Sequence, residues 1–427
     1  MISAIAFVVL AAIGVPIAFV LGWMGLIQVF FYGGSLSFLE IMPQRLFDAV
    51  DSFTLIAIPF FVLVGELMNR SGTAERLIQL ARCLVGRFKG GMGYANIASG
   101  AVMAAIMGSA AAEAAARAPI LVPAMEKDGY DRELAVAITA AGSLLGPIIP
   151  PSMVFIVYGV TAGVSISAMF IGGILPGILL TFMLFSLVWF IVRKRKLVTS
   201  YRASRKEIWV TFISSLPALV IPVIIVGGIL IGLFTPTESA LIACIWILLI
   251  DRLFFKELSI EAIKESLMST GIVSASVLLV MAAANIFAWL LAVDRVPQAV
   301  MQLIGSITST PWIILLFINI FLLIVGMFMD GLAAIPILVP VFYPIVIQMG
   351  WDPVHFGLMV SVNLIVGLIT PPVGLVIFTV SSICNVSLEK TTRALLPFIY
   401  LMVLYIFIIA FWPSLSLFLP KTMGLIH

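Results

Sequence analysis

Two pairs of adjacent prolines, each set in a long uncharged stretch, constrain this chain more than any other feature. The first pair, Pro150-Pro151, lies within residues 134–192, which carry no charged side chain, and the second is Pro371-Pro372. Proline has no amide hydrogen and its ring clashes with the preceding turn, so each pair predicts a break in a helix. A helix broken inside a bilayer leaves carbonyls that only protein or a water-filled cavity can surround. The sequence therefore predicts an ion-binding site at each break.

The composition indicates an all-α polytopic membrane protein. Of the 427 residues, 63% are hydrophobic and 10% are charged, whereas soluble domains carry about 25% charged residues. Uncharged runs longer than the roughly 20 residues that cross a bilayer recur along the chain. The net charge is only +3 and the basic residues cluster in loops, so we expect no nucleic-acid partner.

The second half of the chain repeats features of the first. Each proline of the second pair lies 221 residues after its counterpart in the first pair. The motif Pro-Ile-Leu-Val-Pro occurs at 119–123 and again at 336–340, an offset of 217 that pairs Glu113 with Asp330. The difference between the two offsets predicts four extra residues in the second copy. Two copies of one unit are typical of secondary transporters.

Each break follows an apolar stretch that we predict to be a re-entrant hairpin. The first stretch, 92–125, contains Gly108-Ser109 near its middle, and the second, 311–348, contains Asp330. Two limbs of about 16 residues would each be about 24 Å long. That length is short of the roughly 30 Å hydrocarbon core.

Basic segments set the predicted orientation, because positively charged loops stay in the cytoplasm. Basic residues cluster at 70–89 and at 193–206, and two spans between them place both clusters inside. The first hairpin then opens inside and the second outside, which predicts an inverted-topology repeat. The N-terminus is expected to be cytoplasmic and the C-terminus periplasmic.

The repeat divides the chain into five predicted segments. Hairpins and broken helices fall in two transport halves, and clean spans form a scaffold around them. The segments are an N-terminal span and connector (1–52), a first transport half (53–165, broken helix 134–159), scaffold spans (166–266), a second transport half (267–392, broken helix 354–380) and a C-terminal span (393–427).

Three charged residues within the apolar hairpins are candidate functional groups. Asp330 is the only acidic residue between Asp294 and Asp352. A carboxylate within the membrane is functional by default, although aspartate also caps helices well and could begin the hairpin's second limb. Glu113 stands four residues before Arg117, so the pair forms an internal salt bridge or serves the function.

Small and hydroxyl-bearing residues complete the candidate set. Gly108-Ser109 either allows close helix packing or offers carbonyl and hydroxyl oxygens, which hard cations such as sodium prefer. Thr370 precedes the second proline pair, where its hydroxyl is well placed for a cation. Ser152 and Asn363 line the site or bond a neighbouring helix. His355 is expected near an outer surface and is no candidate for a buried catalytic group.

Together these motifs resemble the large membrane subunit of TRAP transporters. The resemblance spans essentially the whole chain and rests on Gly108-Ser109, Gly146-Pro-Ile-Ile-Pro-Pro-Ser152, Phe234-Thr-Pro-Thr-Glu238, the Asp330 hairpin and Gly367-Leu-Ile-Thr-Pro-Pro-Val-Gly374. It implies a sodium-coupled elevator carrier of the ion transporter superfamily that imports an organic acid, such as a dicarboxylate, keto acid or sialic acid. It also implies a bacterial inner-membrane location and two partners, a small four-helix membrane subunit and a periplasmic substrate-binding protein.

The resemblance further implies ligands for two or more sodium ions, with no enzymatic activity. The first group comprises Ser109, Gly146, Ile149 and Pro151, and the second comprises Gly326, Asp330, Thr370 and Val373. Substrate would lie between the two hairpin tips, with Gly108, Ser109, Ser152, Asp330 and Asn363 as the predicted contacts.

Three other interpretations compete with this one. An autonomous sodium- or proton-coupled dicarboxylate carrier of similar architecture would be expected to carry Ser-Asn-Thr-type hairpin tips, which the sequence lacks, and would not need a binding protein. An intramembrane protease would need a second carboxylate facing Asp330, for which Glu113 is the sole candidate, or a histidine near Ser109. A channel is disfavoured because paired hairpins closing on a midplane site indicate alternating access.

Overall fold

The computed structural model describes residues 9–10, 13–31, 37–195, 203–308 and 310–426, and every regular element in these ranges is helical. Within them, seven helices are long and apolar enough to cross a membrane, which confirms a multi-pass all-α protein. Residues 2–8 and 11–12 of the predicted first span, and Lys196 and Arg202 of the second basic cluster, lie outside the described residues.

The helices follow one another with short connections. In chain order they are α2 (Ile17–Phe31), α3 (Ser37–Val50), η1 (Phe53–Ile56), α4 (Ala57–Arg70), α5 (Thr73–Val85), α6 (Gly91–Met107), α7 (Ala110–Lys127), α8 (Arg132–Ser143), α9 (Met153–Ala162), α10 (Ile166–Arg193), α11 (Arg205–Pro222), η2 (Val223–Gly227), α12 (Gly228–Leu230), α13 (Pro236–Ile250), η3 (Asp251–Phe255), α14 (Ile260–Val293), α15 (Val296–Ile307), α16 (Pro311–Phe328), α17 (Gly331–Gln348), α18 (Pro353–Gly367), α19 (Leu375–Ile383), α20 (Leu388–Phe411) and α21 (Pro413–Thr422).

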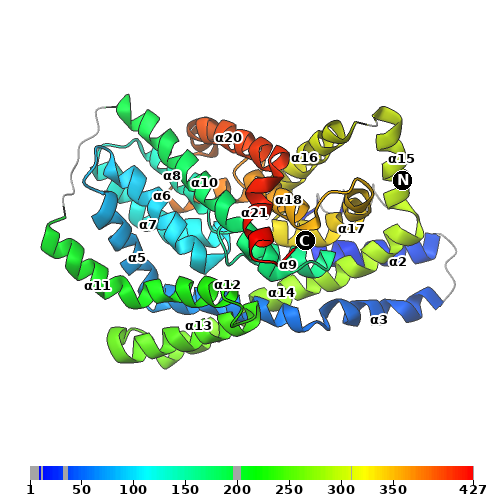
Figure 1. Cartoon of the computed structure of the whole chain (residues 1–427), viewed down its shortest axis with the longest axis horizontal. Helices are drawn as coiled ribbons and strands as arrows, with labels where there is room; N and C mark the ends of the chain where they lie inside the picture. The colour runs from blue at the N-terminus through cyan, green and yellow to red at the C-terminus, as the bar shows by residue number, and fades with distance from the viewer. Residues whose placement is uncertain (1–8, 11–12, 32–36, 196–202, 309, 427) are drawn as a thin grey trace.

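A long layer of helices runs along the lower edge of Figure 1, and we call it the lower layer. It comprises α2–α4 and α11–α14, with α14 packed against α2, α3 and α4, and α13 packed against α4. The 34 residues of α14 make it about 51 Å long at 1.5 Å per residue. The hairpins and the helices that follow them lie above this layer in the same view.

Two helix pairs and two interrupted helices lie at the positions where the sequence predicts the hairpins and the broken helices. α6 and α7 meet at Gly108-Ser109, and α16 and α17 meet at Met329-Asp330. The breaks separate α8 from α9 and α18 from α19, and each contains a cis peptide bond within its proline pair. The local chemistry of proline therefore determines where these helices stop.

The helix bounds correct the predicted pairing between the two halves. α7 and α17 have 18 residues each, and both of their bounds differ by 221. At this offset Asp330 takes the position of Ser109 rather than that of Glu113, and no four-residue insertion is needed. The shared Pro-Ile-Leu-Val-Pro motif suggested an offset of 217 because α17 carries an additional proline, Pro336.

Contacts between helices cross the boundaries of the predicted segments. α10, predicted as a scaffold span, packs against α6, α9, α18 and α20. Its glycines permit this approach, since a Cβ at Gly177 would lie 2.5 Å from Ile149 Cγ1. α4 and α14, predicted in the transport halves, pack against helices of the lower layer, and they also pack against α6 and α17 of the hairpins, respectively. The C-terminal helix α20 packs against α8 and α18.

Candidate functional site

The tip of the first hairpin lies against the first helix break. α6 ends at Met107, and Gly108 after it has a left-handed φ of 50°. Ser109 caps α7 by accepting a hydrogen bond from the Ala112 amide. A Cβ built on Gly108 would lie 3.5 Å from the carbonyl oxygen of Pro151 and 3.4 Å from the amide nitrogen of Met153. Glycine at position 108 thus allows both the left-handed turn and the close approach of the tip to the break.

The first break offers the carbonyls that the sequence predicted. Ser152 is fully buried, and its hydroxyl donates to the Pro147 carbonyl at 2.6 Å while accepting from the Phe155 amide. Among the described residues, no hydrogen bond reaches the carbonyl oxygens of Gly146, Ile149 or Pro151. These oxygens are the kind of orphaned acceptor that a bound cation satisfies.

The second hairpin and the second break approach each other through backbone. A Cβ at Gly367 would lie 2.2 Å from the Gly326 carbonyl carbon, so the two helices touch without intervening side chains. The Gly374 amide donates to the Met327 carbonyl at 3.2 Å, which ties the break to the end of α16. The Thr370 hydroxyl donates to the Val366 carbonyl at 2.8 Å, so its lone pairs remain available.

Asp330 occupies the N-cap position of α17 but does not act as a cap. Its side chain is half-buried and makes no capping hydrogen bond. The carbonyls of Gly326, Thr370 and Val373 also accept no hydrogen bond from the described residues. One carboxylate, one hydroxyl and several carbonyls therefore lie on the two segments that meet here.

The first turn of α9 lies between the two hairpin tips. Its Met153 amide is close to Gly108, as described above, and its Val154 Cγ1 would lie 3.4 Å from a Cβ built on Gly331, the first residue of α17. α9 also packs along α17, while α19 packs along α7, so each break is followed by a helix that joins the opposite hairpin. This exchange brings the two predicted ligand groups into one region of the molecule.

The donor set of this region fits a hard cation. Across the described ranges, no three side chains of His, Cys, Asp or Glu gather, which are the ligands that transition metals favour. The donors are carbonyl, hydroxyl and carboxylate oxygens instead, and such oxygens suit alkali and alkaline-earth cations. The residues present are thus compatible with sodium.

Asn363, a predicted substrate contact, makes its hydrogen bonds elsewhere. It is fully buried, and its Nδ2 donates to Asn319 Oδ1 and to the Met359 carbonyl, both at 2.8 Å. Asn319 precedes Gly326 by seven residues, or about 10 Å along α16. The Nδ2 group of Asn363 therefore joins α18 to α16, while its Oδ1 is buried and accepts no hydrogen bond from the described residues.

A buried polar network in the first hairpin is more extensive than the sequence indicated. Glu113 and Arg117 are fully buried and form a salt bridge, and Arg117 Nη2 donates to the carbonyl of Asn96 at 2.7 Å. Asn96 in turn donates to Thr139 Oγ1 at 2.7 Å, which links α6 to α8. A Cβ at Gly146 would lie 2.3 Å from Glu113 Oε2, so this carboxylate borders the first break.

The spacing of Glu113 and Arg117 within an apolar stretch indicated an internal salt bridge, and the structure shows both side chains fully buried. Glycines create the space for it, because a Cβ at Gly100 or Gly142 would lie 2.6 Å or 3.0 Å from the guanidinium nitrogens of Arg117. At the second hairpin's matching positions, 221 residues later, stand Ala334 and Leu338. The buried ion pair therefore belongs to the first hairpin alone.

The arrangement gives no support to proteolytic chemistry. Glu113, the only candidate partner for Asp330, is already paired with Arg117. His355 lies in the first turn of α18, its side chain is buried, and its Nδ1 lies 3.4 Å from Ser416 Oγ. Leu364 borders the second hairpin's tip. His355 stands nine residues before Leu364, or about 14 Å away along α18.

Comparisons with known proteins agree with this architecture. Residues 4–415 match the model of the tripartite ATP-independent periplasmic transporter, DctM component. The chain is 37% identical over 400 residues to the 2,3-diketo-L-gulonate TRAP transporter large permease protein YiaN of Escherichia coli K12, covering 94% of this chain and 93% of that protein. It is 34% identical to the sialic acid TRAP transporter large permease protein SiaM of Vibrio cholerae, covering 96% and 95%.

A solved structure shares the fold at low sequence identity. The YdaH transporter of Alcanivorax borkumensis superposes with a TM-score of 0.64 at 17% identity, covering 89% of this chain and 88% of that one. The family model, by contrast, spans nearly the whole sequence. The chain therefore belongs to the DctM component family of tripartite ATP-independent periplasmic (TRAP) transporters, whose members are large permeases and not enzymes.

Proposed function

We propose that the protein imports an organic acid across the bacterial inner membrane, driven by sodium, with its site between the two hairpin tips. The observation that carries this proposal is the position of the first turn of α9, which contacts Gly108 on one side and Gly331 on the other. One substrate placed there would touch both halves of the chain. The relatives YiaN and SiaM bear the names of transporters for two carboxylic acids, 2,3-diketo-L-gulonate and sialic acid.

The proposed preference for an anion rests on helix termini. α7 and α17 begin at the hairpin tips, and α9 and α19 begin directly after the breaks that the tips contact. A helix N-terminus carries a partial positive charge, so four of them together favour a carboxylate. Sodium ions held by the predicted ligands would add positive charge and offset the carboxylate of Asp330.

The proposed mechanism is an elevator movement. The two hairpins with their broken helices would form the moving body, and the lower layer would form the support on which it slides. The equal offset of 221 between helix bounds supports a repeat, and the positions of the basic segments favour the inverted form, in which the second half has the opposite orientation. The two partners of TRAP large permeases would be a small membrane subunit and a periplasmic binding protein that delivers the acid.

Uptake into proteoliposomes tests this function. The vesicles would contain the chain with its small membrane subunit, and candidate binding proteins would supply labelled sialic acid, keto acids or C4-dicarboxylates. We expect uptake under an inward sodium gradient and none under an equal potassium gradient. Uptake that needs no binding protein would instead identify an autonomous carrier, and uptake driven only by a proton gradient would refute sodium coupling.

Sodium binding can be measured separately from transport. A ligand at 100 times its dissociation constant stabilises a protein by about 2.7 kcal/mol per site. We therefore expect a higher melting temperature in sodium chloride than in potassium or choline chloride at equal ionic strength, and a smaller difference in Asp330→Asn. A sodium effect of unchanged size in this variant would remove Asp330 from the ion site.

A further inference from the structure

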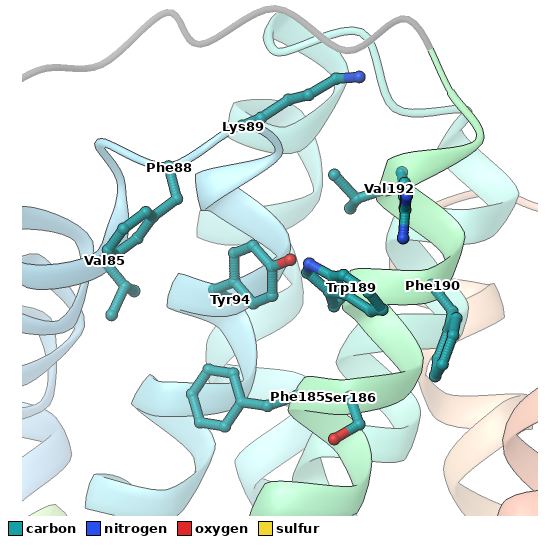
Figure 2. Close-up of a pocket in the computed structure, with 10 residues that line it drawn as sticks. Val85, Phe88, Lys89, Tyr94, Phe185, Ser186, Trp189, Phe190 and Val192 are labelled. Carbon is teal, nitrogen blue, oxygen red and sulfur yellow. The ribbon is translucent and has the colours of Figure 1, made fainter.

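A pocket of about 790 Å³ opens at the basic end of the molecule, away from the hairpin tips. It lies between the end of α5, the first turns of α6 and the last turns of α10, and Figure 2 shows the side chains around it. The pocket is as large as those that hold drug-sized ligands, which range over roughly 300–1,000 Å³. Nothing in the proposed transport cycle uses it.

Aromatic rings form the walls of this pocket. Tyr94 on α6 stacks on Phe185 of α10 with ring centroids 6.0 Å apart, and Trp189 lies one turn further along α10. Figure 2 shows these three rings facing the same space, with Phe88 at its edge. Phe88 and Trp189 remain 50% and 46% exposed, although burial of such large apolar surfaces is strongly favourable. An apolar ligand would cover them.

Two cationic side chains stand at the rim above these rings. Lys89 extends from the loop before α6, as Figure 2 shows, and Arg193 lies in the last turn of α10 with its guanidinium 5.3 Å from the ring centroid of Trp189. Among the described residues neither one forms a salt bridge, whereas the neighbouring Arg195 is paired with Asp131. The rim therefore carries positive charge that no carboxylate neutralises.

The loop that carries Lys89 is fixed to the rest of the pocket. The hydroxyl of Tyr130 donates to the Gly90 carbonyl at 2.7 Å. Gly90 has a φ of 68°, and a Cβ there would lie 2.6 Å from Val192 Cγ1, so the loop rests directly on α10. The two cations are thus attached to segments that contact each other, which favours binding of one anionic group by both.

The pocket lies at the depth of lipid headgroups. α10 has 28 residues and is about 42 Å long, so its last turn extends beyond a hydrocarbon core of roughly 30 Å. Tyrosine and tryptophan are enriched at this boundary, and lysine and arginine beside it mark the cytoplasmic leaflet, whose surface is rich in anionic lipid. Basic pockets between membrane helices on this side bind anionic headgroups.

We propose that this pocket binds one anionic phospholipid of the cytoplasmic leaflet. The phosphate would lie between Lys89 and Arg193, and an acyl chain would cover the rings of Tyr94, Phe185 and Trp189. A protein partner accounts less well for the same features, because an apolar helix would leave the two rim cations unpaired. A phosphate with an attached acyl chain satisfies the rim and the walls together.

Quenching of tryptophan fluorescence tests the proposal. The full-length chain would be reconstituted in phosphatidylcholine containing either brominated phosphatidylglycerol or brominated phosphatidylcholine at the same mole fraction. The contribution of Trp189 is the difference between the native chain and Trp189→Phe. We expect brominated phosphatidylglycerol to quench Trp189 more strongly than brominated phosphatidylcholine does. The difference should correspond to an association constant about fivefold or more higher for phosphatidylglycerol, because each basic side chain near the surface contributes about a fivefold factor.

Matched variants identify the cause of the preference. Lys89→Gln with Arg193→Gln should abolish it, whereas Lys264→Gln, which removes an exposed lysine from α14, should leave it unchanged. Trp312, 56% exposed in an uncharged stretch, should show equal quenching by both lipids.

Three results would overturn the proposal. They are equal quenching of Trp189 by the two lipids, a preference that survives the loss of both rim cations, and loss of access of both lipids to Trp189 when the small membrane subunit is present. The last result would identify the pocket as a protein interface.

Discussion

Replacement of Arg117 by methionine is expected to destabilise the protein strongly. The guanidinium forms the salt bridge to Glu113 and donates to the carbonyl and side-chain oxygens of Asn96, all without solvent exposure. The second carboxylate oxygen of Glu113 already has no hydrogen-bond partner among the described residues. Arg117→Met would therefore leave a fully buried carboxylate with no partner, and removal of one member of such a pair costs about 3–5 kcal/mol.

The double variant Glu113→Gln/Arg117→Met should be far less destabilised than the two single changes added together. It removes both buried charges, and a neutral replacement of a buried ion pair is often tolerated. The loss of hydrogen bonds to Asn96 should still cost about 1–3 kcal/mol. We expect a coupling energy of at least about 2 kcal/mol between the two positions.

The free energy of unfolding can be measured by titration with sodium dodecyl sulfate in mixed micelles, followed by tryptophan fluorescence. Glu389 and Arg393 provide the matched control, because they have the same residue types and spacing but their side chains are 75% and 76% exposed. Their coupling should not exceed about 0.5 kcal/mol. An Arg117→Met variant that loses less than about 1 kcal/mol, or strictly additive changes at 113 and 117, would contradict the reasoning.

Three further predictions concern the breaks and the orientation. Gly367→Ala should abolish sodium-dependent thermal stabilisation, because its Cβ would lie 2.2 Å from the backbone of α16. The control Gly271→Ala, which has no atom within 4 Å of the new Cβ, should retain the stabilisation. Equal behaviour of the two variants would refute the close approach. Thr370→Val should raise the sodium concentration needed for half-maximal stabilisation, since it removes the proposed hydroxyl ligand but no volume, and an unchanged midpoint would exclude that ligand. Single cysteines at the exposed positions Lys127 and Gln348 should react with an impermeant maleimide from opposite faces of the membrane, and reaction from one face would exclude the inverted repeat.

The chemistry of glycine, proline and charge, which acts within a few residues, made much of the fold predictable. Proline pairs stop a helix wherever they occur in it, so the breaks at 150–151 and 371–372 could be located from the sequence. The absence of charge over long stretches similarly required a membrane. The hairpin tips at Gly108-Ser109 and Asp330 followed because polar residues interrupt stretches too short for two full spans.

Contacts between distant segments could not be predicted in this way. The exchange that packs α9 on α17 and α19 on α7 joins residues that are far apart in the chain, and it alone places both tips around one helix turn. The burial of Glu113 and Arg117 depends on glycines contributed by neighbouring helices. The sequence by itself determined where the helices break and which oxygens become free. The tertiary structure decided which of those oxygens meet, because packing depends on the shapes of surfaces that come together only when the chain folds.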